Sequence, residues 1–176
     1  MAETEHDLTT FIRTVQDFPT PGIDFKDISP LLADAYALSQ SIEMLADYYR
    51  DKQIEYVAGI EARGFLIAAP LSLQLEAGLL PIRKSGKLPG PVFSLEYELE
   101  YGSATLELQK GCFSEGSNIL IVDDVLATGG TAECAAQLVN LAGGKVAGFG
   151  FLISLDFLAG RKRIAGYEEV TLVRYD

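Results

Sequence analysis

The sequence predicts an α/β fold in which a central parallel sheet is flanked by helices. Apolar runs of strand length, such as "YVAGI" at 56–60 and "NILIV" at 118–122, alternate with longer segments of helical periodicity. These runs lack polar alternation, which is typical of strands covered by helices on both faces. The 176 residues are 48% hydrophobic and 22% charged, so we expect a single domain, residues 1–176, with its own core.

The N-terminal elements are predicted from spacing and from the placement of prolines. A short amphipathic helix is expected where apolar residues share one helical face, at Leu8, Phe11, Ile12 and Val15. Residues 17–30 hold three prolines and a glycine in fourteen positions, which predicts a rigid loop rather than a regular element. Helical spacing returns at 35–50, where we expect a second helix.

Beyond residue 50 the predicted strands and helices alternate. A strand at 56–60 is followed by a helix over 63–77 and a strand at 79–83. Residues 92–100 and 104–110 alternate with period two around "YGS", which predicts a β-hairpin or an excursion from the main sheet. The remaining elements are predicted as strand, helix, strand and strand, at 118–122, 130–144, 145–155 and 169–175.

Charge and hydropathy argue against several classes of protein. The net charge of −11 disfavours a nucleic-acid binder, because affinity for a phosphate backbone is largely driven by cations. The acidic N-terminus lacks the pattern of a secretory signal, and the most apolar window, 64–82, is interrupted by Pro70, Gln74 and Glu76, so we expect no membrane span. Two cysteines are too few for a disulfide scaffold, which favours a reducing, cytoplasmic setting.

The stretch "NILIVDDVLATGGTA" at 118–132 predicts a site that binds a sugar phosphate. Asp123 and Asp124 follow an apolar strand and, as acceptors, suit the two hydroxyls of a ribose. The free amides at the start of the next helix, near Thr131, suit a phosphate. This loop, which is neither a P-loop nor a dinucleotide fingerprint, comprises Ala127, Thr128, Gly129, Gly130 and Thr131. The alternative, a solvated acidic strand end followed by a glycine turn, leaves the full pattern unexplained.

Residues 119–131 resemble the ribose-phosphate signature of type I phosphoribosyltransferases, which use 5-phosphoribosyl-1-pyrophosphate (PRPP). The rest of the chain resembles the adenine-specific members of that family. The resemblance implies the type I phosphoribosyltransferase fold, with a small N-terminal hood (1–33) that recognises the base and a mobile β-hairpin lid (93–108). It also implies a homodimer, and Mg²⁺ held mainly by substrate oxygens and water rather than directly by the protein. Neither His6 nor the cysteines form a metal-ligand set.

Two further stretches resemble the pyrophosphate site of the family. "GIEARGF" at 59–65 follows the strand at 56–60, and the resemblance places Ala62 and Arg63 on the pyrophosphate, with a non-proline cis peptide at Glu61–Ala62. Arginine can clamp a phosphate with two hydrogen bonds. "IRKSGKLPGP" at 82–91 adds a basic cluster, some of which is implied to reach a neighbouring subunit: Arg83, Lys84 and Lys87. A surface arginine and a solvated basic loop are the alternatives for each stretch taken alone.

The segment 18–30, "FPTPGIDFKDISP", resembles the base-recognition segment of the adenine enzymes. By position, Phe25 stacks on one face of adenine and Val125 covers the other. Backbone groups around Asp24 face the amino-substituted edge, and Lys26 lies beside the ring. Family members often carry arginine where Lys26 stands, and lysine lacks the planar fork of a guanidinium.

Residues 99–108, "LEYGSATLEL", resemble the mobile lid. Glu100 takes the position of the family's proposed general acid/base, and Tyr101 that of a lid residue; without the resemblance, a solvated hairpin tip is the simpler interpretation. The implied reaction converts adenine and PRPP to AMP and pyrophosphate. The alternatives are a phosphoribosyltransferase for another purine or for orotate, a PRPP-sensing regulator without catalysis, and a plain α/β interaction module. An acidic chain without an added domain disfavours the regulator.

Overall fold

The computed structural model describes residues 7–98 and 102–176, and its centre is a seven-stranded sheet. The strand order is β5-β6-β4-β3-β7-β8-β9. Strands β4, β3, β7, β8 and β9 run parallel, whereas β5 and β6 form an antiparallel hairpin attached to β4. The bounds of these strands are β3 Tyr56–Ile60, β4 Gly78–Lys84, β5 Val92–Glu98, β6 Ser103–Gln109, β7 Asn118–Leu126, β8 Lys145–Leu155 and β9 Glu169–Tyr175.

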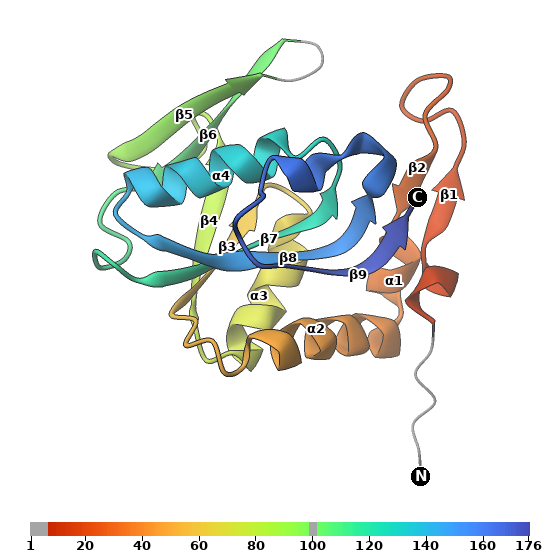
Figure 1. Cartoon of the computed structure of the whole chain (residues 1–176), viewed down its shortest axis with the longest axis horizontal. Coiled ribbons are helices and arrows are strands. Elements are labelled where there is room, and N and C mark those ends of the chain that lie inside the picture. Colours follow the sequence, from red (N-terminus) through yellow and green to blue (C-terminus); the bar gives the residue numbers. More distant parts are fainter. Residues whose placement is uncertain (1–6, 99–101) are drawn as a thin grey trace.

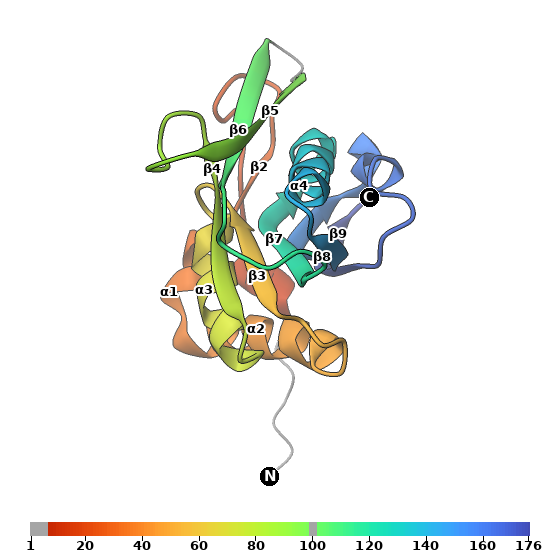
Figure 2. The same ribbon diagram turned by 90° about the vertical axis from the view of Figure 1, so that its left-hand side faces the viewer.

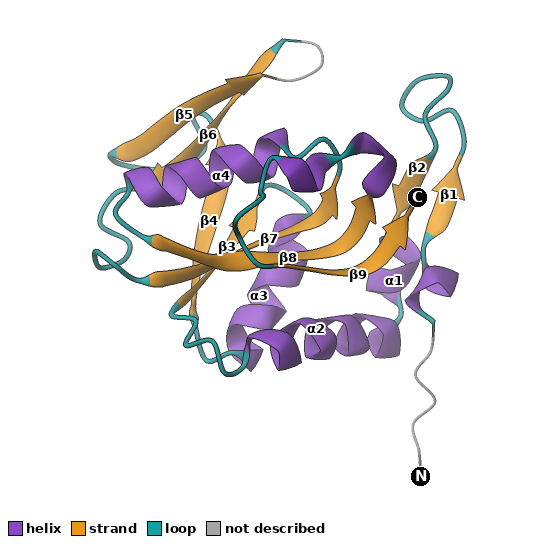
Figure 3. Ribbon diagram, viewed as in Figure 1, coloured by secondary structure: helices purple, strands orange, loops and turns teal. Residues whose placement is uncertain are grey.

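Helices cover both faces of the sheet (Figures 1 and 3). On one face lie α1 (Ser29–Ala33), α2 (Ala35–Tyr49) and α3 (Gly64–Gln74), and on the other lies α4 (Gly130–Leu141). Each face therefore has its own apolar core, since side chains of β7 and β8 alternate between the two layers. The predicted α/β class with a mostly parallel sheet is confirmed.

The prediction for the N-terminal segment is wrong in part. The expected helix is a single 3₁₀ turn, η1 (Leu8–Phe11), after which the chain extends into β1 (Arg13–Val15). The expected loop contains β2 (Phe25–Asp27), which pairs antiparallel with β1. Four apolar residues at helical spacing are too few to hold a helix when an extended partner is available, and β-branched side chains favour the strand.

Two boundaries move in a way that matters for the site. Strand β7 continues to Leu126, so Asp123 and Asp124 lie inside the strand, near its carboxyl end, rather than after it. The helix expected over 63–77 begins one residue later, at Gly64, whereas the one expected over 130–144 begins at Gly130 as predicted, so each starts a few residues after the end of β3 or β7.

Two hairpins project at the same end of the molecule, above the carboxyl ends of the parallel strands (Figure 2). One is the hood pair β1–β2 and the other is the hairpin β5–β6, which confirms the predicted hairpin. The predicted tip of this hairpin, with Glu100 and Tyr101, lies outside the described residues. Among residues 7–98 and 102–176, no helix has both the length and the apolar character needed to cross a membrane.

Candidate functional site

A cleft of about 440 Å³ opens at the carboxyl ends of β3 and β7, between the two hairpins. Ligands of parallel α/β proteins bind at this position, where neighbouring strands feed loops that diverge. Four parts of the chain contribute its walls: the hood, the loop after β3, the end of β7 with its following loop, and the hairpin strands. Its main lining residues are Asp24, Phe25, Lys26, Glu61, Ala62, Arg63, Lys84, Tyr97, Asp123, Asp124, Val125, Ala127, Thr131 and Leu155.

The two aspartates line the cleft, where Asp124 is buried and Asp123 is half-buried. Burial, and next the charge of Asp124, raises the pKa of Asp123 well above its usual range. Burial also raises the pKa of Asp124, although the nearby Arg63 guanidinium opposes the rise. Oδ1 of Asp123 accepts a hydrogen bond from the backbone N–H of Asp124 at 2.9 Å. The pair therefore gathers carboxyl oxygens at one point of the site, where ionisation of both groups together is disfavoured.

Arg63 spans the cleft from the loop after β3. Its Nε lies 2.9 Å from Oδ2 of Asp124, as an ion pair whose geometry leaves that oxygen without a hydrogen bond among the described residues. The guanidinium carbon lies 5.1 Å from the centroid of the Phe25 ring. Gly64 allows this approach, because a Cβ there would lie 2.8 Å from the carbonyl oxygen of Val122. The expected cis peptide at Glu61–Ala62, just before Arg63, is present.

The loop 127–131 lies beside the aspartates and presents backbone rather than side chains. Gly129 has φ 82°, a conformation that favours glycine, and no described side chain caps the start of α4. The helix therefore begins with free N–H groups directed at a second hollow of about 70 Å³, which Thr128 and Thr131 also line. Amides and the helix dipole favour an anion at this place.

The three basic residues at the end of β4 and just after it are not equally available. Lys84 lines the cleft, but Arg83 and Lys87 are both paired with Glu61, a residue that the sequence did not single out. Glu61 also accepts a hydrogen bond from the backbone N–H of Lys84 at 2.9 Å. These contacts, that with Lys87 first, lower the pKa of Glu61 to about 2. The structure thus brings Lys84 into the cleft and holds the other two at its rim.

On the hood side of the cleft, Phe25 and Val125 both line the wall, and the resemblance expects these two residues to enclose a planar ring. Phe18 supports Phe25 edge-on, with ring centroids 5.2 Å apart. Asp24 and Leu155 complete this side, and Leu155 was not predicted because it lies at the far end of a long apolar strand.

Lys26 also lines the cleft, yet its amine is engaged elsewhere. Its Nζ donates to Oγ1 of Thr14 at 2.9 Å and lies 4.3 Å from the centroid of the Tyr175 ring. The side chain thus ties the hood to the end of β9. Opposite the hood, the hydroxyl of Thr131 donates to the hydroxyl of Tyr97 at 3.3 Å, so the hairpin contacts the phosphate-loop helix. Tyr97 gave no signal in the sequence beyond strand alternation.

Comparisons with known proteins agree with this arrangement. Residues 27–172 match the family model described as the phosphoribosyl transferase domain. An adenine phosphoribosyltransferase of Halothermothrix orenii is 49% identical over 168 residues, which cover 96% of this chain and 99% of that protein.

Solved structures of the same kind of enzyme superpose closely on the chain. The adenine phosphoribosyltransferase of Thermoanaerobacter pseudethanolicus has a TM-score of 0.92 at 48% identity, covering 96% of this chain and 98% of that one. The enzyme of Saccharomyces cerevisiae, solved with an imino-altritol bisphosphate and adenine, has a TM-score of 0.88 at 38% identity, covering 94% and 96%. The family model and the full-length similarity confirm the resemblance, and the chain belongs to the adenine phosphoribosyltransferases of the phosphoribosyltransferase family.

Proposed function

We propose that the cleft transfers the 5-phosphoribosyl group from PRPP to adenine, with AMP and pyrophosphate as products, as a step of purine salvage. One observation carries the proposal: two carboxyl groups, one buried and one half-buried, lie at the end of β7 beside a helix start whose amides no described side chain caps. The carboxylates suit a diol and the amides suit a phosphate, which are the two ends of one ribose 5-phosphate.

In this proposal Asp123 and Asp124 accept hydrogen bonds from the ribose hydroxyls. The 5′-phosphate occupies the hollow formed by the loop, where it is bound by Ala127, Thr128, Gly129, Gly130 and Thr131. Because these donors come mainly from backbone, they are fixed before the ligand arrives, and no side-chain entropy opposes binding. The ribose is thereby oriented with its anomeric carbon towards the base side.

The pyrophosphate lies on the opposite side of the ribose, in contact with Ala62 and Arg63. Arg63 must then exchange its contact with Asp124 for the ligand. Lys84 approaches the same position from β4. For Arg83 and Lys87 we propose an electrostatic contribution, made either to the same cleft or to that of a neighbouring subunit.

Adenine is enclosed between the ring of Phe25 and the side chain of Val125. Backbone groups around Asp24 bind the amino-substituted edge, and this pairing is what excludes bases that lack the amino group. Lys26 lies beside the ring. Because its amine donates a hydrogen bond to Thr14, Lys26 influences the base indirectly, by keeping the hood in position.

The donor set of the cleft fits Mg²⁺ bound together with PRPP. The two aspartates are oxygen donors, and Oδ2 of Asp124 is buried without a hydrogen bond among the described residues. They would hold the ion mainly through the ribose hydroxyls, with substrate oxygens and water as its direct ligands. The ion would neutralise charge on the departing pyrophosphate.

The chemistry requires little beyond positioning and control of charge. As pyrophosphate leaves, the anomeric carbon becomes cationic, and the two carboxyl groups on the ribose hydroxyls stabilise it. We assign Glu100, which lies outside the described residues, as the base that accepts a proton from the imidazole edge of adenine. Tyr101 belongs to the same lid, whose closure would exclude water from the activated sugar.

We further propose a homodimer located in the cytoplasm. Support for an interface comes from a groove of about 540 Å³ between α2 and α3, lined by Leu38, Ile42 and Pro70. Leu73, which also lines the groove, is 80% exposed, and Leu66 on the same helix is 51% exposed. Exposed leucines beside a groove lined by apolar side chains support an interface at this face. Free thiols at Cys112 and Cys134 suit a reducing compartment.

The test is formation of AMP from adenine and PRPP with Mg²⁺, run against hypoxanthine, guanine and orotate. We expect adenine to be preferred by a factor of about 10³ or more, because a base without the amino group leaves buried polar groups unpaired. A preference for another base would refute the assignment of the hood, and binding of PRPP without turnover would favour a regulator. Glu100→Gln should lower turnover about 10²-fold or more with little change in PRPP affinity.

A further inference from the structure

Behind the phosphate loop lies a short segment that the proposed reaction does not use. It connects β8 to β9 and contains two 3₁₀ turns, η2 (Asp156–Leu158) and η3 (Gly160–Lys162). Between them Ala159 has φ 54°, a left-handed conformation that is uncommon for a residue other than glycine. The segment therefore holds an unusual backbone shape, and contacts on both sides maintain it.

On one side the segment packs directly on the phosphate loop, backbone to backbone. A methyl group at Gly160 would overlap the carbonyl oxygen of Ala127, and one at Gly129 would overlap the carbonyl oxygen of Gly160. A side chain at either glycine would force the backbone of the facing segment to shift. Gly160 thus forms the rear wall of the loop, and any displacement of Gly160 moves Gly129.

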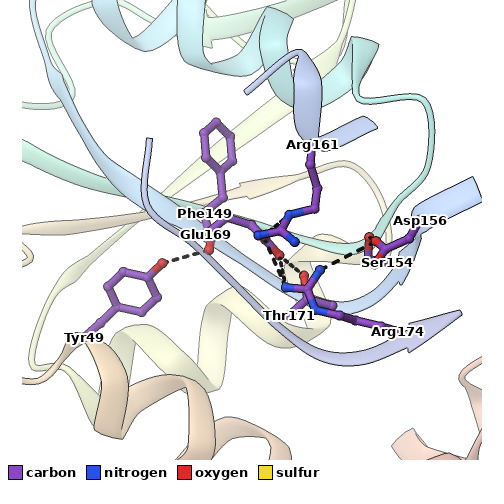
Figure 4. Close-up of polar contacts among 8 residues, drawn as sticks. All are labelled: Tyr49, Phe149, Ser154, Asp156, Arg161, Glu169, Thr171 and Arg174. Carbon is purple, nitrogen blue, oxygen red and sulfur yellow. Dashed lines mark hydrogen bonds and ion pairs between the residues drawn. The ribbon is translucent and has the colours of Figure 1, made fainter. Parts of the chain in front are cut away.

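On the other side, charged residues fasten the segment to the sheet (Figure 4). The carboxylate of Glu169, at the start of β9, is 5% exposed and receives Nε of Arg161 at 2.8 Å. The same carboxylate forms an ion pair with Arg174 at 3.1 Å and accepts a hydrogen bond from the hydroxyl of Thr171. Arg174 in turn lies 3.6 Å from Asp156, at the beginning of the segment.

We propose that Arg161 and Glu169 are positioning residues for the 5′-phosphate, acting through Gly160 on the loop 127–131. The ion pair fixes η3, η3 fixes Gly160, and Gly160 fixes the amides that face the phosphate. This inference rests on the proposed function, because it takes the loop to be the phosphate subsite. Neither residue touches the ligand, so the effect is one of geometry and not of direct attraction.

The most informative variant is Arg161→Gln. Glu169→Gln would leave two arginines facing a neutral group at a buried point and would destabilise the fold. The side chain of Arg161, in contrast, is 54% exposed, and Glu169 stays paired to Arg174 when Arg161 is changed. Lys162→Gln is the matched control. It removes the same charge from the adjacent exposed position of η3, which tests simple attraction between a cation and the phosphate.

Dissociation constants for AMP and for adenosine, measured by titration calorimetry, separate the possibilities. In Arg161→Gln we expect AMP to bind about threefold to tenfold more weakly, with adenosine unchanged, and in Lys162→Gln we expect both ligands to bind as in the parent protein. Arg161→Lys, which keeps a donor for Glu169, should restore most of the loss. The melting temperature of each variant without ligand reports any general damage.

Several outcomes would overturn the inference. Unchanged AMP affinity in Arg161→Gln would do so, as would equal weakening of AMP and adenosine, or an equal effect in Lys162→Gln. Failure of the proposed function is a separate result, seen in the parent protein itself: AMP would then bind no more tightly than adenosine.

Discussion

Replacement of Glu61 by glutamine tests the idea that this carboxylate holds the basic loop after β4. Glutamine keeps the size of the side chain and an oxygen that can accept from the N–H of Lys84, but it removes the charge that pairs with Arg83 and Lys87. The pKa of Glu61 falls from an ordinary 4.5 to about 2, chiefly through the hydrogen bond from Lys87. A difference of this size corresponds to about 3 kcal/mol, which solvent screening at the part-exposed cations reduces to about 1–2 kcal/mol.

The dependence on pH follows from the direction of this change. Because folding lowers the pKa, Glu61 contributes its full stabilisation above about pH 4.5 and loses it as the pH falls towards about 2. Urea denaturation should therefore show Glu61→Gln less stable than the parent by about 1–2 kcal/mol at pH 7, with the gap narrowing at lower pH.

A control isolates the role of the buried contact. Glu43→Gln removes the same charge from an exposed carboxylate that lies 3.7 Å from Arg50, and should change the free energy of unfolding by less than about 0.5 kcal/mol. The reasoning about Glu61 would be refuted by equal stabilities of Glu61→Gln and the parent at pH 7, or by a gap that stays constant down to pH 3.

Three further changes have defined outcomes. Asp123→Asn should abolish most activity yet raise the free energy of unfolding at pH 7 by about 0.5–1 kcal/mol, because it removes repulsion from Asp124; a less stable variant in denaturation would contradict this. Gly129→Ala should weaken AMP binding at least about tenfold and destabilise the fold by about 1–3 kcal/mol, since φ is 82° and the methyl would meet Gly160, which calorimetry and denaturation can check. Lys26→Met should raise the KM for adenine more than that for PRPP, and steady-state kinetics showing the reverse would place Lys26 on the pyrophosphate side.

Most of the sheet could be predicted from the sequence, because the central strands β3 and β7 left short apolar runs that alternate along the chain with segments of helical length. The N-terminal segment could not. Its apolar spacing between Leu8 and Val15 satisfies both a helix and a turn followed by a strand, and pairing of Val15 with Phe25 decides between them. The end of β7 was placed too early because Asp123 and Asp124 interrupt the run, although they remain in the strand.

In the site, too, some residues could be predicted from the sequence and others could not. The aspartate pair and the loop 127–131 form one contiguous stretch, so their chemistry could be inferred from order alone. Glu61 could not be identified, because its partners Arg83 and Lys87 lie 22 and 26 residues away and only the parallel pairing of β3 with β4 brings them together. Gly160 was missed for the same reason, since its role depends on backbone contact and not on a side chain.

The hood has a consequence for how such enzymes diversify. Within the described residues, β1 and β2 form a sheet of their own and share no ladder with the seven strands. In the function proposed above, the hood supplies Phe25 as one wall of the base site, whereas Val125 of β7 and the ribose and phosphate residues belong to the main sheet and its following loop. The two frames are joined by side-chain contacts such as that of Lys26 with Tyr175. Exchange of the N-terminal segment alone would therefore alter one wall of the proposed base site and leave the sugar-phosphate part of the proposed site unchanged.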